Sequence, residues 1–173
     1  MEIEHITRTK LRGPAPPRPA QGGGEIVRLA RLWIGTPYVH QASVKGAGCD
    51  CLGLLRGVWR ELHGEEAEDP PAYSPDWAEA TGRDTLYRAL LRHMTEIEPT
   101  ALAPGDVALF RMGNIGPAKH CGIVADLVLP AEADAYPEQR RLLTLIHARQ
   151  YRRVGEEKFE PFWRARLAHA FRL

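Results

Sequence analysis

The stretch GAGCDCLGLLRGVWREL, residues 46–62, places two cysteines one residue apart where a glycine-rich loop gives way to an apolar helix. We predict Cys51 in the first turn of that helix, with Asp50 before it as the N-cap. A thiol in this position lies near the positive end of the helix dipole and near unpaired N–H groups, which favour the thiolate. Gly53 would let another backbone or a substrate approach closely. The stretch indicates a nucleophilic cysteine, with an inert buried thiol as the alternative for Cys51 taken alone.

A nucleophilic thiol also needs a base within hydrogen-bond reach, and the base needs a group that orients it. His120 begins the run HCGIVAD and His147 ends the run LLTLIH, so both are expected at strand ends near a margin of a sheet. His40 lies in the loop before the cysteines and is a candidate for a contact with substrate or with the site. The remaining histidines have no such context and are interpreted as structural: His5, His63, His93 and His169.

The same thiols and imidazoles raise a second possibility, a zinc site with soft ligands. The candidate ligands are Cys49, Cys51, His120, Cys121 and His147. Neighbouring residues of a strand point to opposite faces, so His120 and Cys121 would diverge. Cys49 and Cys51 flank the start of a helix, and convergence on one tetrahedral ion would require distortion. We therefore predict no metal and no cofactor, and interpret Cys49 and Cys121 as structural.

The elements that must position these residues follow from the hydrophobic periodicity. Residues 25–35 and 51–62 repeat apolar residues at the spacing of one helix face, and a third helix is predicted for 85–94. Residues 65–77, EEAEDPPAYSPDW, are interpreted as a surface loop. Short runs rich in Val, Ile, Leu and Phe predict strands within 102–112, 118–129, 141–151 and 165–173. The order predicts an α+β fold, with N-terminal helices packed on an antiparallel sheet.

Composition limits the domain organisation and the class of partner. Residues 12–24, RGPAPPRPAQGGG, are predicted to be extended or flexible, so we divide the chain into a flexible extension, 1–24, and one folded domain, 25–173. The net charge is +1 with no basic stripe, which argues against nucleic acid as a partner. Three cysteines do not suggest a disulfide framework. No stretch suits membrane insertion or a signal peptide, so we expect synthesis in the cytoplasm without an export signal.

Five ordered motifs resemble those of the NlpC/p60 family, papain-like cysteine peptidases that cut peptidoglycan stem peptides. The motifs are GTPY (35–38), CDCLG (49–53), PGDVALF (104–110), HCGIV (120–124) and LIHA (145–148). The resemblance covers residues 25–173 and implies the papain-like fold of that family. The approach to the nucleophile, HQASVKGAGCDC, is more similar to the cell-wall peptidases in tail modules of phages and gene transfer agents.

Residue by residue, the resemblance implies that Cys51 is the nucleophile, His120 the general base and His147 the residue that orients it. It also implies that the Tyr38 hydroxyl, with the Cys51 N–H, stabilises an oxyanion. Asp50 matches an acid that helps to bind substrate. Leu52 stands where the family usually has serine, so a different cut or a cross-linked substrate is among the expectations.

The tail-module resemblance implies a setting as well as a reaction. The substrate would be the stem peptides of peptidoglycan, and the protein partners would be tail hub or tip proteins of a phage-like particle. The particle would carry the enzyme to the periplasmic cell wall of a recipient cell. Two alternatives stay open: a non-catalytic structural tail module on the same fold, and a papain-like amidase or acyltransferase. The intact set of Cys51, His120 and His147 favours activity over the first alternative.

Overall fold

The computed structural model describes residues 22–73, 84–113, 116–128 and 141–173. Its helices are α1 (Gly22–Arg31), α2 (Cys51–His63), α4 (Thr85–His93) and α5 (Pro161–Arg164), with one 3-10 turn, η1 (Pro99–Ala101). Its strands are β1 (Ser43–Val44), β2 (Gly48–Cys49), β3 (Thr95–Ile97), β4 (Val107–Phe110), β5 (His120–Val128), β6 (Arg141–Ala148), β7 (Val154–Lys158) and β8 (Leu167–Arg172). None of the helices in these ranges is long and apolar enough to cross a bilayer.

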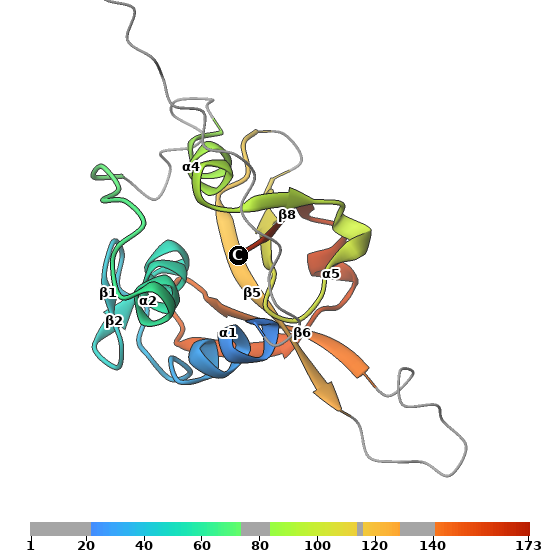
Figure 1. Cartoon of the computed structure of the whole chain (residues 1–173), viewed down its shortest axis with the longest axis horizontal. Coiled ribbons are helices and arrows are strands. Elements are labelled where there is room, and N and C mark those ends of the chain that lie inside the picture. The colour runs from blue at the N-terminus through green and yellow to red at the C-terminus, as the bar shows by residue number, and fades with distance from the viewer. Residues whose placement is uncertain (1–21, 74–83, 114–115, 129–140) are drawn as a thin grey trace, which may run out of the picture.

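Six strands form one antiparallel sheet in the order β3-β8-β4-β5-β6-β7, and β1 and β2 form a separate hairpin. Figure 1 shows α2 on the left of this sheet, α1 beside α2 at the bottom, and α5 on the right. The expected α+β architecture, with N-terminal helices packed on an antiparallel sheet, is confirmed. The four predicted strand regions contain β4, β5, β6 and β8.

The first helix begins at Gly22, three residues before its expected start. Glycine is a poor helix former, but the first turn has no intrahelical partner for its N–H groups, so little is lost there. The apolar face that follows is buried and stabilises the helix by tertiary packing; it comprises Ile26, Val27, Leu29 and Ala30. The proposed division between residues 24 and 25 stays a prediction, because residues 1–21 lie outside the described ranges.

The second helix has the bounds that its end signals predict. Asp50 is the N-cap and accepts a 2.7 Å hydrogen bond from the Gly53 N–H, and Gly64 ends the helix with φ 81°. A Cβ at Gly53 would lie 1.8 Å from the Ala42 carbonyl oxygen, so this glycine admits a neighbouring backbone, as expected. The first turn of the helix, which begins at Cys51, is thereby held in close contact with the preceding loop through Gly53.

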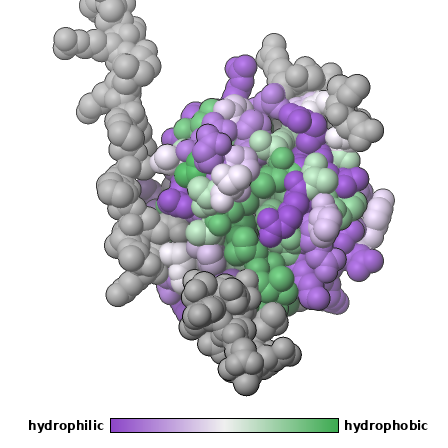
Figure 2. All heavy atoms as spheres, turned by 90° about the vertical axis from the view of Figure 1, so that its right-hand side faces the viewer, coloured by the Kyte–Doolittle hydropathy of each residue, from purple (hydrophilic) through white to green (hydrophobic). Residues whose placement is uncertain are grey.

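The sheet carries apolar clusters on both faces. One face packs against α1, α2 and α4, and Cys121, Ile123 and Ala125 of β5 belong to this larger cluster. The other face has a smaller cluster that includes Phe110 of β4 and Trp163 of α5. Figure 2 shows the right-hand side of the molecule, where a strip of hydrophobic residues runs between hydrophilic ones. The helix on the side of the smaller cluster, α5, has only four residues, whereas α1, α2 and α4 pack against the opposite face.

Gly57, in the middle of α2, is predicted to be a critical packing position. A Cβ there would lie 2.0 Å from the Trp33 ring, which is buried and donates a 2.9 Å hydrogen bond to Glu61. We expect Gly57→Ala to lower the free energy of unfolding by about 1–3 kcal/mol, because the indole has no space to move. Urea denaturation followed by circular dichroism measures the change.

Gly24→Ala is the matched control, since nothing lies within 4 Å of a Cβ at that helical glycine. It should be neutral or stabilise slightly through helix propensity. Equal destabilisation by the two substitutions would show that contact with Trp33 is not the cause.

Candidate active site

Cys51 is the first residue of α2, and its side chain is partly exposed. Its sulfur lies 4.0 Å from the Lys119 carbonyl oxygen, and the Cys121 thiol lies 3.4 Å from the Cys51 carbonyl oxygen. The pKa of Cys51 is held well below its ordinary value, because hydrogen bonds from Cys121 and from His120 favour the thiolate and outweigh the effect of burial. The position at a helix N-terminus acts in the same direction. This thiol is therefore poised to be a nucleophile.

The two predicted histidines meet on adjacent strands. His120 is the first residue of β5 and His147 lies near the end of β6; His120 Nε2 and His147 Nδ1 are 2.8 Å apart. The other ring nitrogen of His147 lies 2.8 Å from Glu157 Oε1, on β7. A chain of polar groups therefore runs from the thiol across three strands: Cys51, His120, His147 and Glu157.

Glu157 fixes which atom donates and which accepts in each hydrogen bond of this chain of polar groups. Burial raises the pKa of Glu157, but His147 and Trp163 favour the carboxylate more strongly and hold the pKa below its ordinary value. A carboxylate only accepts hydrogen bonds, so His147 must donate from Nε2 and present its Nδ1 lone pair to His120. His120 then donates from Nε2, and its Nδ1 is left to exchange a proton with the thiol. The carboxylate thus selects the tautomer of both rings.

The pKa of His147 is lowered to about 4 by burial and by the nearby His120 ring. Its side chain is only 2% exposed, so a positive charge there would be poorly solvated. At neutral pH His147 therefore stays uncharged, and a proton taken from the thiol remains on His120. This arrangement suits a general base supported by an orienting residue.

Trp163 holds the two imidazoles and the carboxylate in place. Its indole N–H donates a 2.9 Å hydrogen bond to Glu157 Oε1. Its ring stacks on His120 with centroids 5.4 Å apart and meets His147 edge-on at 4.8 Å. Glu157 and Trp163 were not predicted from the sequence, since VGEEK has little strand character and α5 has only four residues. A Pro-Phe-Trp stretch after a charged run is the one available signal for α5.

Tyr38 lies beside the segment that leads into Cys51. Its backbone forms a parallel bridge with Cys49, and its N–H donates a 2.9 Å hydrogen bond to the Arg152 carbonyl oxygen. Burial, and then the proximity of Cys51 and Asp50, raise the pKa of Tyr38 to about 12. The hydroxyl therefore keeps its proton and can donate a hydrogen bond next to the thiol.

Asp50 is buried, and its carboxylate is used by the protein itself. It accepts hydrogen bonds from the Gly53 N–H, the Gln41 N–H at 2.8 Å and the Tyr73 hydroxyl at 2.6 Å. His40 Nδ1 lies 3.6 Å away. Burial raises the pKa of Asp50 in spite of these donors. His40, a candidate for a contact with substrate or with the site, lies against Asp50 and Tyr73.

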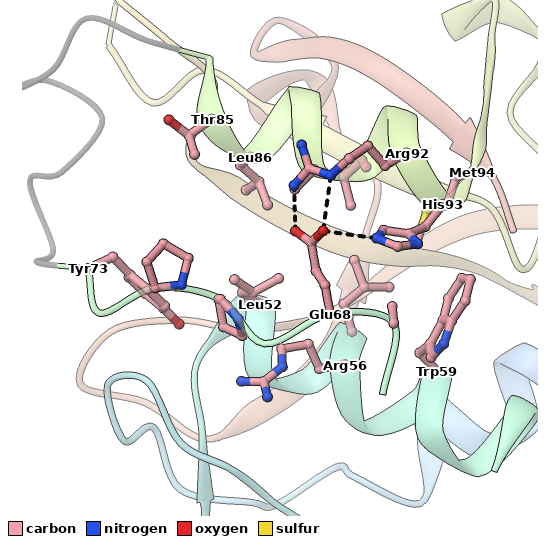
Figure 3. Close-up of a pocket in the computed structure, with 16 residues that line it drawn as sticks. Leu52, Arg56, Trp59, Glu68, Tyr73, Thr85, Leu86, Arg92, His93 and Met94 are labelled. Atoms are coloured by element: carbon pink, nitrogen blue, oxygen red, sulfur yellow. Dashed lines mark hydrogen bonds and ion pairs between the residues drawn. The ribbon is translucent and has the colours of Figure 1, made fainter. Parts of the chain in front are cut away.

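An apolar pocket of about 120 Å³ lies between α2, α4 and the loop that follows α2. Figure 3 shows Leu52 and Tyr73 towards one end of it and Trp59 and His93 towards the other. Glu68 spans the pocket from the loop to α4, where it pairs with Arg92 and His93. The loop after α2, expected only as surface, is thus fixed to both helices.

Cys49 lies fully buried in the core, where burial raises its pKa to about 12. Cys121 is buried too, and its thiol lies against the carbonyl oxygen of Cys51. In the described ranges, no group of three or more His, Cys, Asp or Glu side chains is arranged to hold a metal ion.

Known structures with this architecture are NlpC/p60 domains. The NlpC/p60 domain of the peptidoglycan hydrolase SagA has a TM-score of 0.56 and 20% identity, over 87% of this chain and 98% of that one. The chain has the NlpC/p60 fold. An NLP/P60-family protein from Staphylococcus aureus, described as similar to a lipoprotein, gives a TM-score of 0.57 and 18% identity over 96% of this chain. An NlpC/P60 family protein from Bacillus cereus gives a TM-score of 0.55 and 20% identity over 90% of this chain.

This chain spans 45% of the Staphylococcus protein and 41% of the Bacillus protein. By sequence, no family model matches the chain, and no curated protein matches either. At these identities the likeness concerns the NlpC/p60 fold, which confirms the expected fold. The roles of Cys51, His120, His147, Tyr38 and Asp50 remain predictions.

We expect iodoacetamide to alkylate Cys51 well before Cys49 and Cys121, because only Cys51 combines exposure with a lowered pKa. The rate at Cys51 should be nearly constant from pH 8 to neutral pH. It should fall only as the pH drops through the lowered pKa, below the value of about 8.5 for a free cysteine. Mass spectrometry of peptides from timed reactions gives the rate at each thiol.

Glu157→Ala should move the midpoint of that pH profile upwards by about one unit, since His147 and His120 lose the group that fixes their tautomers. Glu156→Ala is the matched control: the neighbouring side chain on β7 pairs with Arg31 instead. Equal labelling of all three cysteines would exclude an activated Cys51. An unchanged profile in Glu157→Ala would remove Glu157 from the site.

Proposed function

We propose that this protein is a cysteine endopeptidase that cuts stem-peptide bonds of peptidoglycan. The observation that carries the proposal is the polar chain of Cys51, His120, His147 and Glu157, assembled from α2 and three successive strands. A thiol with a lowered pKa, a base and a carboxylate-fixed orienting residue together suit nucleophilic acyl transfer. The peptidoglycan substrate is supported by the fold shared with a domain of the peptidoglycan hydrolase SagA.

In the proposed reaction, the Cys51 thiolate attacks the carbonyl carbon of the scissile amide while His120 carries the proton. The tetrahedral intermediate collapses when the carbon–nitrogen bond breaks, and His120 gives its proton to the departing amine. Water then attacks the thioester, with His120 as the base, and releases the carboxylate product and the thiol. His147 stays neutral throughout and keeps Nδ1 of His120 directed to the sulfur.

Two donors are available for the oxyanion of the intermediate. Cys51 is the first helical residue, so its N–H has no intrahelical acceptor. The Tyr38 hydroxyl lies close enough to Cys51 for the charge of the thiolate to raise the pKa of Tyr38, so the hydroxyl keeps its proton. Each such donor typically contributes about 3–4 kcal/mol to stabilisation of the transition state.

Two alternatives use the same fold. A papain-like amidase or acyltransferase would share the acyl-enzyme step and differ in the bond cut or in the acceptor, so product analysis separates it from an endopeptidase. A non-catalytic structural module would not need a lowered thiol pKa or a base fixed by a carboxylate. The complete polar chain therefore favours an enzyme.

Incubation with purified peptidoglycan should release peptide fragments whose masses identify the bond cut. Cys51→Ala and His120→Ala should each reduce the rate by at least about 10⁴-fold, because members of a catalytic unit act together. His147→Asn should be milder, about ten- to a hundredfold, since an amide can accept from His120 and donate to Glu157. Cys49→Ala is the control and should keep most of the activity. Release of the same fragments by Cys51→Ala would contradict the mechanism.

We also propose that the enzyme acts from a phage-like tail, with hub or tip proteins as partners, after synthesis in the cytoplasm. This part rests on the resemblance of HQASVKGAGCDC to tail-module peptidases. Particles purified from producing cells should contain the chain, and particles with Cys51→Ala should deliver their contents less efficiently. Absence of the chain from intact particles would refute the tail role. Presence with undiminished delivery would leave a structural part whose peptidase activity is dispensable.

A further inference from the structure

Cys121 is a second thiol in contact with the nucleophile, and the proposed reaction does not use its sulfur. That sulfur lies 3.4 Å from the Cys51 carbonyl oxygen, and the two thiols also hydrogen-bond to each other. The residues are 70 positions apart in the chain and meet where β5 packs on the start of α2. Two thiols in contact can be joined by oxidation, which a single cysteine cannot undergo alone.

The environments of the two thiols differ in a way that suits stepwise oxidation. Cys51 is partly exposed and is held as a thiolate, the form that attacks an oxidant. Cys121 is completely buried; its hydrogen bond with Cys51, and then burial, raise the pKa of Cys121 well above the ordinary value. An oxidant in solution therefore reacts at Cys51, while Cys121 stays reduced beside it.

Oxidation of Cys51 removes part of what keeps Cys121 protonated. The first product, a sulfenic acid, no longer carries the negative charge that acts on Cys121. The position of Cys121 is fixed by strand pairing, opposite Leu109 of β4. Because the two thiols are already in contact, the sulfurs have only a short way to move to reach a bonding distance of about 2 Å.

We propose that Cys51 and Cys121 form a redox-sensitive modification site, in which Cys121 captures oxidised Cys51 as an intramolecular disulfide. The oxidant is a peroxide and the reductant a thiol. The disulfide switches the nucleophile off reversibly and keeps it from the irreversible sulfinic and sulfonic acids. This inference goes beyond the proposed function, because it needs the two thiols and no peptide substrate.

Two steps form the bond, and each releases one water. First, the Cys51 thiolate attacks an oxygen of hydrogen peroxide; the sulfur–oxygen bond forms as the oxygen–oxygen bond breaks, and the departing hydroxide takes the proton held by His120. Cys51 is thereby oxidised by two electrons and the peroxide is reduced. Then the Cys121 sulfur attacks the Cys51 sulfur; the sulfur–sulfur bond forms, the sulfur–oxygen bond breaks, and the hydroxide leaves with the Cys121 proton. Two equivalents of a thiol reduce the disulfide.

Cys49 is the alternative partner, since it lies two residues before Cys51 and is also buried. Its contacts differ from those of Cys121. Burial is the main cause of its raised pKa, and Cys51 acts on it only through charge, without a hydrogen bond between the thiols. We therefore expect the disulfide at Cys121, and Cys49 provides the matched control.

The first test locates the bond in the full chain. The protein is oxidised with hydrogen peroxide, the remaining thiols are blocked with iodoacetamide, and trypsin digestion is followed by mass spectrometry without reduction. Cleavage after Lys and Arg leaves Cys49 and Cys51 together in residues 46–56 and Cys121 in residues 120–140. We expect these two peptides as a linked pair that dithiothreitol separates. The same pair from Cys49→Ala would assign the bond to Cys51.

The second test measures protection of the nucleophile. Cys121→Ser keeps a small side chain with a hydrogen-bond donor but cannot form the bond. After peroxide and then dithiothreitol, Cys51 of the wild type and of Cys49→Ala should react with iodoacetamide again. Cys121→Ser should recover at least about threefold less of this reactive Cys51, with the remainder as sulfinic or sulfonic acid.

Three results would overturn the proposal: no linked pair in the oxidised wild type, a bond between Cys49 and Cys51 in its place, or equal recovery of Cys51 in Cys121→Ser. The linked pair is measured in the wild type, so the first test does not depend on the folding of a variant. Neither test uses peptidoglycan. The proposed function is judged separately, by the release of fragments in the reduced state.

Discussion

Asp50 accepts three hydrogen bonds at the start of α2 and so joins three segments that are distant in the sequence. It caps the helix, holds the backbone of Gln41, and fixes Tyr73 from the loop beyond the helix. Gly53 completes the junction, since only a residue without a Cβ lets the Ala42 carbonyl approach. The position of Cys51 depends on this junction, because the capping geometry decides where the first helical residue lies.

The two histidines are positioned by other interactions. His120 and His147 are held by strand pairing, by the Glu157 carboxylate and by the Trp163 ring. The carboxylate gives the chain a direction, because an acceptor at its far end allows only one tautomer in each imidazole. Burial keeps the middle ring neutral. The direction of hydrogen bonding in the site is therefore set on β7, two strands away from β5.

Local signals explain what the sequence could predict. Asp50 and Gly64 mark both ends of α2, and apolar runs mark β5 and β6, so Cys51, His120 and His147 were assigned to the elements that hold them. Glu157 could not be found in this way, because its strand is polar and depends on pairing with β6. The contact of Tyr73 with Asp50 could not be found either, since it joins residues 23 positions apart, across α2 and the loop that follows it.

Two small residues after His120 allow the separate halves of the site to meet. Cys121 faces α2, where its sulfur lies against the Cys51 carbonyl oxygen. Gly122 faces the other way: a Cβ there would lie 3.0 Å from the His147 Cβ, so a side chain would push His147 away. A larger residue at either position would separate His120 from the thiol or from its orienting ring. The approach of His120 to the Cys51 thiol thus depends on the size of residue 121, and its approach to His147 on the size of residue 122.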